Sequence, residues 1–349
     1  MSYESDYNKS LGDLRAVLTN FKPGQKTYDE IVGTRDQVLA KYGPVFSRAH
    51  TAVISREEFS SFLYFENNHH WSGLYRKGLG AADNINLLRQ ALDILLNEDV
   101  AIQRRFPEAI AKVPGLGKAL ATAILTVAFP QKYGVWNNTS EAALLQLNLF
   151  PESARGEGIG RKYAKINAVL LRLCEDLSID LWTLDALWWF LLEPDRLPPT
   201  STQTDSSQQL ESFGLEKQLE DFLLENWERT ILAKEWDIYS EPNDPEAGNQ
   251  YPTDVGRIDI LAQHKHEARF LVIELKRSQT TDQTIGQALR YVGWVKQHLA
   301  TSGQNVEALI ISHRVEKEAF YAISTLTNVK MMTYQIDFHL KDVEPLTPK

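Results

Sequence analysis

Apolar residues recur at spacings of three and four over most of the first 193 residues, which predicts a helical region. A polar and Pro-rich stretch then covers residues 194–212 and is typical of a linker. From residue 213 onward, helical periodicity alternates with short apolar runs that are typical of strands. We therefore expect an all-α N-terminal domain over residues 1–193, a linker over 194–212 and an α/β C-terminal domain over 213–349.

The C-terminal part contains several strand-like runs, and two of them are close together in the chain. We expect strands at residues 235–239, 257–262, 269–276, 306–312 and 329–335, and helices at 215–231 and 281–299. The polar segment 263–266 lies between the second and third of these strands. This order favours a hairpin of residues 257–262 with residues 269–276.

Charged residues interrupt both strands of the predicted hairpin. Asp259 lies in the first strand, and Glu274 and Lys276 share one face of the second because side chains alternate along a strand. Pairing would bring Asp259 near Glu274, and two adjacent carboxylates repel each other unless a cation lies between them. A hard divalent ion fits such oxygen ligands, Mg²⁺ above all, or Mn²⁺. In that site Lys276 would orient or activate an attacking water and neutralise charge in the transition state.

Two further residue pairs are spaced for one helix face. Gln287 and Tyr291 are four residues apart in the predicted helix 281–299, so they can support the metal site or contact a nucleic acid backbone. Glu216 and Glu220 are four residues apart in the predicted helix 215–231, and either could reach the metal through water.

The ordered set of Asp259, Glu274-Leu275-Lys276 and Gln287-x-x-x-Tyr291 resembles the PD-(D/E)XK nuclease superfamily. The similarity covers roughly residues 215–335 and is strongest to the C-terminal domain of NucS-type and RecB-like endonucleases. It implies a restriction-endonuclease-like core with a central mixed sheet. It also implies that Asp259, Glu274 and the backbone carbonyl of Leu275 bind the metal, and that Lys276 assists catalysis.

The N-terminal part contains a glycine motif, Val113-Pro114-Gly115-Leu116-Gly117-Lys118, that resembles the turn of a helix-hairpin-helix. Glycines allow close approach of the backbone to a phosphate, and the following helix offers free amides. A second Gly-x-Gly, at residues 158–160, precedes two basic residues. The residues that we expect to contact DNA are Gly115, Gly117, Lys118, Arg161 and Lys162. The alternatives are a tight helix–helix turn without a ligand and a solvated basic helix start.

The hairpin and residues 128–138 also resemble the helical domain of DNA glycosylases. Ala119 stands where bifunctional members carry the Schiff-base lysine, and Asn137 or Asn138 stands where they carry the catalytic Asp. The resemblance therefore implies a similar fold without base-excision chemistry. Near the N-terminus, the adjacent His69 and His70 favour a capped loop over a metal site, since neighbouring residues do not share a helix face.

Composition narrows the class of protein. Of 349 residues, 43% are hydrophobic and 24% are charged, which is typical of a globular protein. Cys174 is the single cysteine, which excludes an internal disulfide or a Cys-based zinc site and fits a cytoplasmic location. The apolar run 181–192 is too short to span a bilayer, so we expect no membrane partner. The net charge of −9 argues against broad electrostatic capture of DNA, which would depend on local basic patches.

Together, the two resemblances imply a Mg²⁺- or Mn²⁺-dependent DNA endonuclease that acts in defence against foreign DNA or in DNA repair. DNA is the expected partner, and a homodimer is possible. A nucleic-acid-binding protein with a silent nuclease fold is the alternative, and a glycosylase-like protein is a third option.

Overall fold

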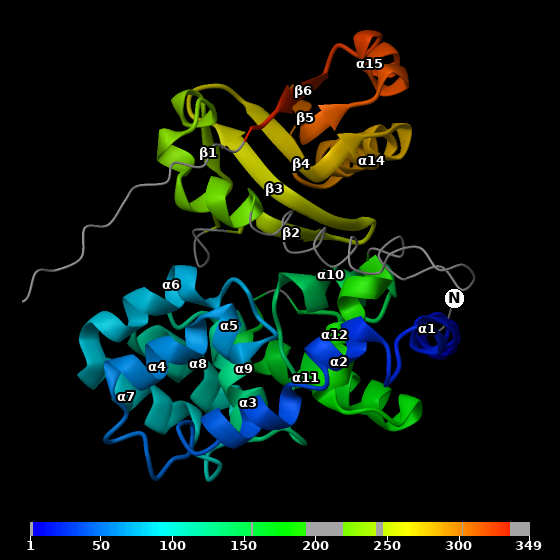
Figure 1. The fold of residues 1–349 in the computed structure, drawn as a ribbon. Coiled ribbons are helices and arrows are strands. Elements are labelled where there is room, and N and C mark those ends of the chain that lie inside the picture. The colour runs from blue at the N-terminus through cyan, green and yellow to red at the C-terminus, as the bar shows by residue number, and fades with distance from the viewer. Residues whose placement is uncertain (1–2, 155, 193–218, 242–246, 302, 336–349) are drawn as a thin grey trace, which may run out of the picture.

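The computed structural model describes residues 3–154, 156–192, 219–241, 247–301 and 303–335. Helices fill the described residues up to 192, here called the helical half (Figure 1). The predicted linker 194–212 and Glu216 lie outside the described residues. The helices are α1 (Tyr3–Thr19), α2 (Lys26–Ile31), α3 (Arg35–Tyr42), α4 (Arg56–Leu63), α5 (Phe65–Asn68), α6 (Leu74–Ala81), the 3-10 turn η1 (Ala82–Asn84), α7 (Ile85–Leu95), α8 (Ile102–Lys112), α9 (Lys118–Ala128), α10 (Asn138–Gln146), α11 (Ile159–Leu177) and α12 (Leu181–Leu192).

Residues 219–335, here called the sheet half, form a six-stranded mixed sheet with helices. The sheet runs β1-β3-β4-β5-β6, and β2 pairs with the same edge of β3 as β1 does. β3 and β4 form an antiparallel hairpin, whereas β4–β5 and β5–β6 are parallel pairs joined by helical crossovers. The elements are η3 (Trp227–Arg229), η4 (Leu232–Lys234), β1 (Trp236–Ile238), β2 (Asn249–Thr253), β3 (Gly256–His264), β4 (Arg269–Thr280), α14 (Asp282–His298), β5 (Asn305–Val315), α15 (Lys317–Ser324) and β6 (Val329–Thr333).

Two sequence predictions for the sheet half need correction. The predicted helix 215–231 is too long, because residues 219–225 are helical and η3 follows as a separate 3-10 turn. We call residues 219–225 the leading helix. β2 was not predicted, because its residues alternate poorly and include Pro252. That proline is tolerated because β2 lies at the edge of the sheet.

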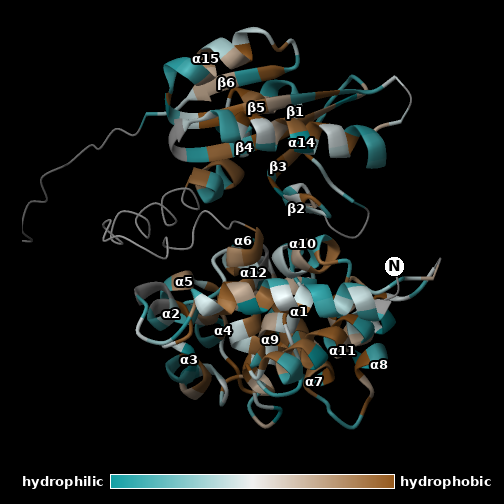
Figure 2. Cartoon of the chain, turned by 90° about the vertical axis from the view of Figure 1, so that its right-hand side faces the viewer, coloured by the Kyte–Doolittle hydropathy of each residue, from teal (hydrophilic) through white to brown (hydrophobic). Residues whose placement is uncertain are grey.

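Each face of the sheet buries its own apolar cluster. Val272 and Ile310 pack beneath α14 and α15, whereas Ile273 and Leu309 pack on the other face with Trp227. The helical half has a separate core, and α9 is buried from Leu120 to Val127. Apolar residues follow β4 and β5 and recur on the helices of the lower half (Figure 2). Because both faces of the sheet are covered, consecutive residues of β4, 270–275, are all buried.

The two halves meet along α10 and α6. α10 packs against β2 and β3, and the side-chain amide of Asn138 donates a 2.8 Å hydrogen bond to the Asn249 carbonyl. α6 faces the leading helix, where Arg76 pairs with Asp221. In Figure 1, α6 and α10 lie at the surface of the helical half that faces the sheet. Two elements at this junction, the leading helix and β3, carry residues of the candidate site described next.

Candidate active site

The β3–β4 register brings two predicted site residues together. Ile260 pairs with Ile273, and extending this antiparallel register by one residue sets Asp259 opposite Glu274. The backbone amide of Leu275 donates a 2.8 Å hydrogen bond to Asp259 Oδ2. The hairpin therefore holds the Asp259 carboxylate beside the Glu274-Leu275-Lys276 segment, as the sequence predicted.

Lys276 is the cation of this cluster. Its Nζ lies 2.9 Å from Glu274 Oε1, and the two side chains point to the same face of β4. The Glu274 side chain is 1% exposed, whereas that of Lys276 is 24% exposed. The ammonium group therefore lies between a buried carboxylate and solvent.

A third carboxylate reaches the cluster from the leading helix. Glu220 is buried, and its Oε2 accepts a 3.0 Å hydrogen bond from Gln250 Nε2 on β2. Its charge contributes to raising the pKa of Asp259, so the two carboxylates are electrostatic neighbours. The sequence left Glu216 and Glu220 as alternatives. Glu220 is near enough for its charge to act on Asp259, and Glu216 lies outside the described residues, so the two remain alternatives.

The pKa of Asp259 reflects its burial and the neighbouring carboxylates. Burial raises its pKa well above the usual value, and the Glu274 and Glu220 carboxylates raise it further. Lys276 and the Leu275 amide lower the pKa but do not compensate fully. The pKa of Asp259 is thus raised first by burial and then by the nearby negative charges, and a bound cation would offset those charges.

Tyr291 and Gln287 are linked by hydrogen bonds to the strand that carries Asp259. Tyr291 is 3% exposed, and its hydroxyl oxygen accepts a 3.1 Å hydrogen bond from the Arg257 amide. Gln287 Nε2 donates a longer, 3.4 Å bond to the same hydroxyl. Gly256 has φ +128°, and a Cβ there would lie 2.6 Å from the Tyr291 hydroxyl. The pair therefore supports the start of β3, two residues before Asp259, and Tyr291 is too buried to contact DNA.

The donor set fits one kind of metal ion. Across the residues that the structure describes, no group of three His, Cys, Asp or Glu side chains is arranged to hold a metal. Asp259 and Glu274 supply two carboxylates, and the Leu275 carbonyl is the further oxygen implied by resemblance. Mg²⁺ commonly binds one or two carboxylates and keeps several waters, whereas structural Zn²⁺ needs four protein ligands. The residues present therefore fit Mg²⁺ or Mn²⁺.

The predicted hairpin turn of the helical half joins α8 to α9. Gly115 has φ +92°, a conformation that favours glycine. Gly117 is the exposed N-cap of α9, and the position where a Cβ would lie is open. Lys118 Nζ lies 2.8 Å from Glu141 Oε2, so its ammonium is engaged within the protein. Burial alone would raise the pKa of Glu141. The charges of Lys118 and Lys162 and the hydrogen bonds from Lys118 and Trp136 hold that pKa below its usual value. The turn offers backbone amides, while Lys118 is partly neutralised.

The second Gly-x-Gly motif divides into two roles. Gly158 is the exposed N-cap of α11, whereas Gly160 is buried against α8. A Cβ at Gly160 would lie 2.2 Å from the Gln103 carbonyl oxygen, so this glycine serves close helix packing. Arg161 is exposed, and Lys162 Nζ lies 5.5 Å from the Trp136 ring centroid. Lys118 also lies over that ring, so both helix starts flank Trp136.

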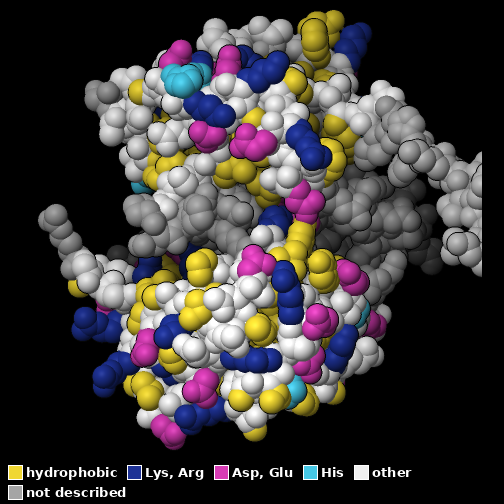
Figure 3. All heavy atoms as spheres, turned by 90° about the vertical axis from the view of Figure 1, so that its left-hand side faces the viewer, with side chains coloured by type: hydrophobic (Ala, Val, Ile, Leu, Met, Phe, Trp, Pro, Cys, Tyr) yellow, Lys and Arg dark blue, Asp and Glu magenta, His cyan; other side chains and the backbone are white. Residues whose placement is uncertain are grey.

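Charge on the surface is mixed. Figure 3 shows acidic and basic side chains interspersed over one face of both halves. This face is unsuited to broad electrostatic capture of a polyanion, as the net charge of −9 indicated.

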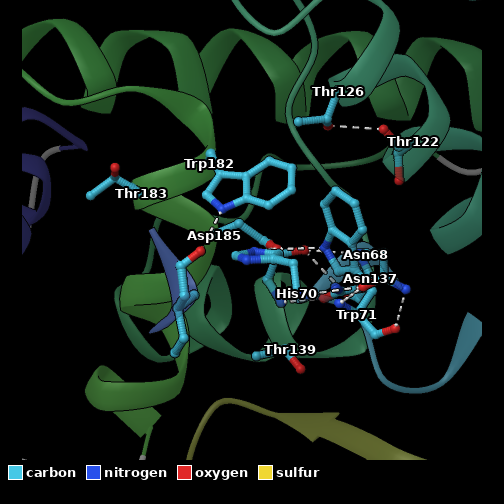
Figure 4. A network of polar contacts seen from close by, with 12 residues as sticks. Asn68, His70, Trp71, Thr122, Thr126, Asn137, Thr139, Trp182, Thr183 and Asp185 are labelled. Carbon is cyan, nitrogen blue, oxygen red and sulfur yellow. Dashed lines mark hydrogen bonds and ion pairs between the residues drawn. The ribbon is translucent and has the colours of Figure 1, made fainter. Parts of the chain in front are cut away.

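The His69-His70-Trp71 segment forms a capped loop with a buried polar network (Figure 4). His69 is the left-handed C-cap of α5, with φ 53°. His70 Nε2 and Trp71 Nε1 each lie 2.9 Å from Asp185 Oδ2 on α12. These contacts tie α5 and the following loop to α12, so this Asp and His have a structural role.

The residues at the glycosylase-like positions also have structural roles. Asn137 forms a capping box with Ser140 at the start of α10, and Asn138 donates to the Asn249 carbonyl of the sheet half. The Asn137 amide is therefore committed to capping, and that of Asn138 to the junction.

The contacts of Gln250 and Arg257 were not predicted from the sequence. Gln250 lies on the unpredicted strand β2 with φ 50°, and Arg257 reaches α10 through its side chain. Neither position carries a local sequence signal, because each acts through a segment distant in the chain.

Comparisons with known proteins do not assign this chain to a family. No protein-family model matches the chain, and a search of curated proteins finds no match. A crystal structure of a repair endonuclease from Pyrococcus abyssi is similar at 17% identity, with a TM-score of 0.28. The alignment covers 40% of this chain and half of the endonuclease. Within the described ranges, no helix has the length and apolarity needed to cross a membrane.

Proposed function

We propose that this chain is a Mg²⁺- or Mn²⁺-dependent DNA endonuclease with a PD-(D/E)XK-type nuclease domain over residues 213–349. The observation that carries the proposal is the convergence of Asp259, Glu274 and Lys276 at one end of the β3–β4 hairpin, with Glu220 beside them. A buried carboxylate pair with a raised Asp pKa and an adjacent ammonium suits cation binding and phosphodiester chemistry better than it suits fold stability.

Each residue has a distinct role in this proposal. Asp259 and Glu274 hold the ion, with the Leu275 carbonyl as a further ligand. The bound ion would polarise the scissile phosphate and lower the pKa of a coordinated water. Lys276, which is partly exposed, orients the attacking water and offsets negative charge on the phosphate. Glu220, held by Gln250, supports the cluster from the leading helix.

The helical half would supply DNA contact through residues 1–193. We propose that backbone amides near Gly115 and Gly117 approach a phosphate, since the start of α9 is exposed. Arg161 and Lys162, at the start of α11, would add positive charge, and Lys162 lies near Trp136 as Lys118 does. Lys118 contributes less, because Glu141 already pairs with it. The cellular role that we propose is defence against foreign DNA or DNA repair.

The second candidate is a nucleic-acid-binding protein whose nuclease fold is silent. The internal Lys276–Glu274 ion pair favours it, because a lysine satisfied in this way needs no metal to be stable. A glycosylase is disfavoured, because Ala119 has no amine and Asn137 and Asn138 carry amides that are already engaged.

A cleavage panel separates these candidates. Purified full-length chain is incubated with single-stranded, duplex, mismatched, branched and modified DNA, with Mg²⁺, with Mn²⁺ or with a chelator. Metal-dependent products that carry 5′-phosphates, absent with Asp259→Asn, support the endonuclease. DNA binding without cleavage of any substrate supports the silent fold. Release of a free base without metal would support the glycosylase.

A further inference from the structure

Arg257 joins the strand that carries Asp259 to the helical half. Its side chain is buried although it carries a charge. Its Nη1 donates a 2.7 Å hydrogen bond to Thr139 Oγ1 on α10, and its guanidinium lies 4.2 Å from the centroid of the Trp189 ring on α12. The backbone amide of the same residue donates to Tyr291. Arg257 is therefore fixed at both backbone and side chain, two residues before Asp259.

A second contact fixes the element that carries Glu220. Asp221, the next residue, forms an ion pair with Arg76 of α6. The Arg76 side chain is 9% exposed and that of Asp221 is 19% exposed, so the pair is largely shielded from water. The helical half thus contacts the leading helix at the residue after Glu220 and β3 two residues before Asp259.

We propose that Arg257 is a positioning residue, and that Thr139 and Trp189 of the helical half hold β3 so that Asp259 faces Glu274 in the geometry needed for cleavage. This inference rests on the proposed function and deepens it, because it makes the helical half part of the assembly of the nuclease site and not only a DNA-binding module. A buried N–H that has lost its acceptor must move or recruit water. Because Arg257 lies on the same strand as Asp259, such a movement would displace the carboxylate.

Three substitutions test the contact with little change in volume. Thr139→Val removes the hydroxyl acceptor but keeps the side-chain shape, and Thr139→Ser keeps the hydroxyl. Arg257→Lys keeps the charge but loses the planar guanidinium that stacks on Trp189. Arg269→Ala is the matched control. Like Arg257, Arg269 lies over a Trp ring, and it pairs with the Glu307 carboxylate, but it is five residues before Glu274, about 16 Å along β4.

Four quantities are measured for the full chain: the single-turnover cleavage rate at saturating DNA, the Mg²⁺ concentration for half-maximal rate, the Kd for DNA and the melting temperature. We expect Thr139→Val and Arg257→Lys to lower the rate by up to ~10², the cost typical of small displacements in an active site. We also expect them to need more Mg²⁺ while binding DNA as tightly as wild type. Thr139→Ser should retain the wild-type rate, and Arg269→Ala should leave rate and Mg²⁺ requirement unchanged.

The outcomes are separable. If Thr139→Val and Arg257→Lys melt at lower temperature but cut at the wild-type rate below that temperature, the contact is only structural and the inference is wrong. If Arg269→Ala lowers the rate as strongly, the effect is general loss of sheet stability and the inference is also wrong. If wild-type protein neither cuts DNA with Mg²⁺ nor binds Mg²⁺ in calorimetry, the proposed function itself is overturned.

Discussion

Asp259 and Leu275 are joined across the β3–β4 hairpin by a 2.8 Å hydrogen bond from the Leu275 amide to the Asp259 carboxylate. The bond lies beyond the last regular pair of the hairpin, Ile260 with Ile273, so the aspartate side chain takes the place of a backbone acceptor. In antiparallel strands, the amide and carbonyl of one residue point to the same side. The Leu275 carbonyl therefore points to the same edge of β4 as the amide that donates to Asp259.

Replacing Asp259 should abolish cleavage and raise stability. Asp259→Asn keeps an oxygen that accepts from Leu275 but removes a charge that burial and two carboxylates disfavour. We expect cleavage to be lost and the melting temperature at neutral pH to rise. Nicking assays and calorimetry measure both.

The pH dependence gives the sign of this effect. The folded-state pKa of Asp259 is raised above 3.8, so the folded state binds more protons than the unfolded state between the two values. Stability of the metal-free protein therefore falls as pH rises through that window and stays lower above it. The stability of Asp259→Asn should not fall in this pH window. It should equal the stability of wild type in the strongly acidic range. Equal stability of the two proteins at pH 7 would contradict the assignment.

Mg²⁺ should stabilise the protein in a pH-dependent way. The ion binds the ionised carboxylates and so competes with the proton on Asp259. At one hundred times its Kd, a ligand specific for the folded state stabilises it by about 2.7 kcal/mol. We expect Mg²⁺ to raise the melting temperature at pH 8 and to have little effect at pH 4. The control is Asp259→Asn, and an equal shift in that variant would place the ion elsewhere.

Lys276 should affect the rate more than metal binding. Lys276→Met keeps the aliphatic stem and removes the ammonium that lies 2.9 Å from Glu274. Loss of one preorganised charge typically lowers the rate by ~10²–10³. Because Lys276 lowers the pKa of Asp259, its removal should also move the acid limb of the pH–rate profile to higher pH. Loss of Mg²⁺ affinity as large as the loss of rate, measured by titration calorimetry, would instead make Lys276 necessary for metal binding.

The parts of the site that could be predicted are those that depend on local pattern. Strand alternation and a short polar turn suffice to bring Asp259 near Glu274 and Lys276, because the hairpin spans few residues. Gln250 could not be predicted, since it reaches Glu220 from a strand without alternation. The Arg257–Thr139 contact could not be predicted either, because it depends on how two distant segments pack.

The two Gly-x-Gly motifs should respond differently to substitution. Gly117 has open space at its Cβ position and φ −79°, so Gly117→Ala and Gly117→Val are sterically compatible with the fold. If the amides at α9 contact a phosphate, Gly117→Val should weaken DNA binding for all sequences alike. Gly160→Ala is expected to lower stability, because its Cβ would lie 2.2 Å from the Gln103 carbonyl. Unchanged DNA affinity in Gly117→Val, measured by fluorescence anisotropy, would remove the turn from the DNA interface.

Asp185 should matter for the stability of the helical half and not for the chemistry of cleavage. Its Oδ2 accepts from His70 and from the Trp71 indole, and all three side chains are buried (Figure 4). Asp185→Ala leaves the buried indole N–H without its acceptor, which typically costs about 1–3 kcal/mol. Urea unfolding of Asp185→Ala should show at least this loss. Asp83→Ala, which breaks the exposed ion pair with Arg56, should cost about 1 kcal/mol or less. Cleavage per folded molecule should stay at the wild-type level, and a lost cleavage rate in folded Asp185→Ala would show that this network serves the nuclease reaction.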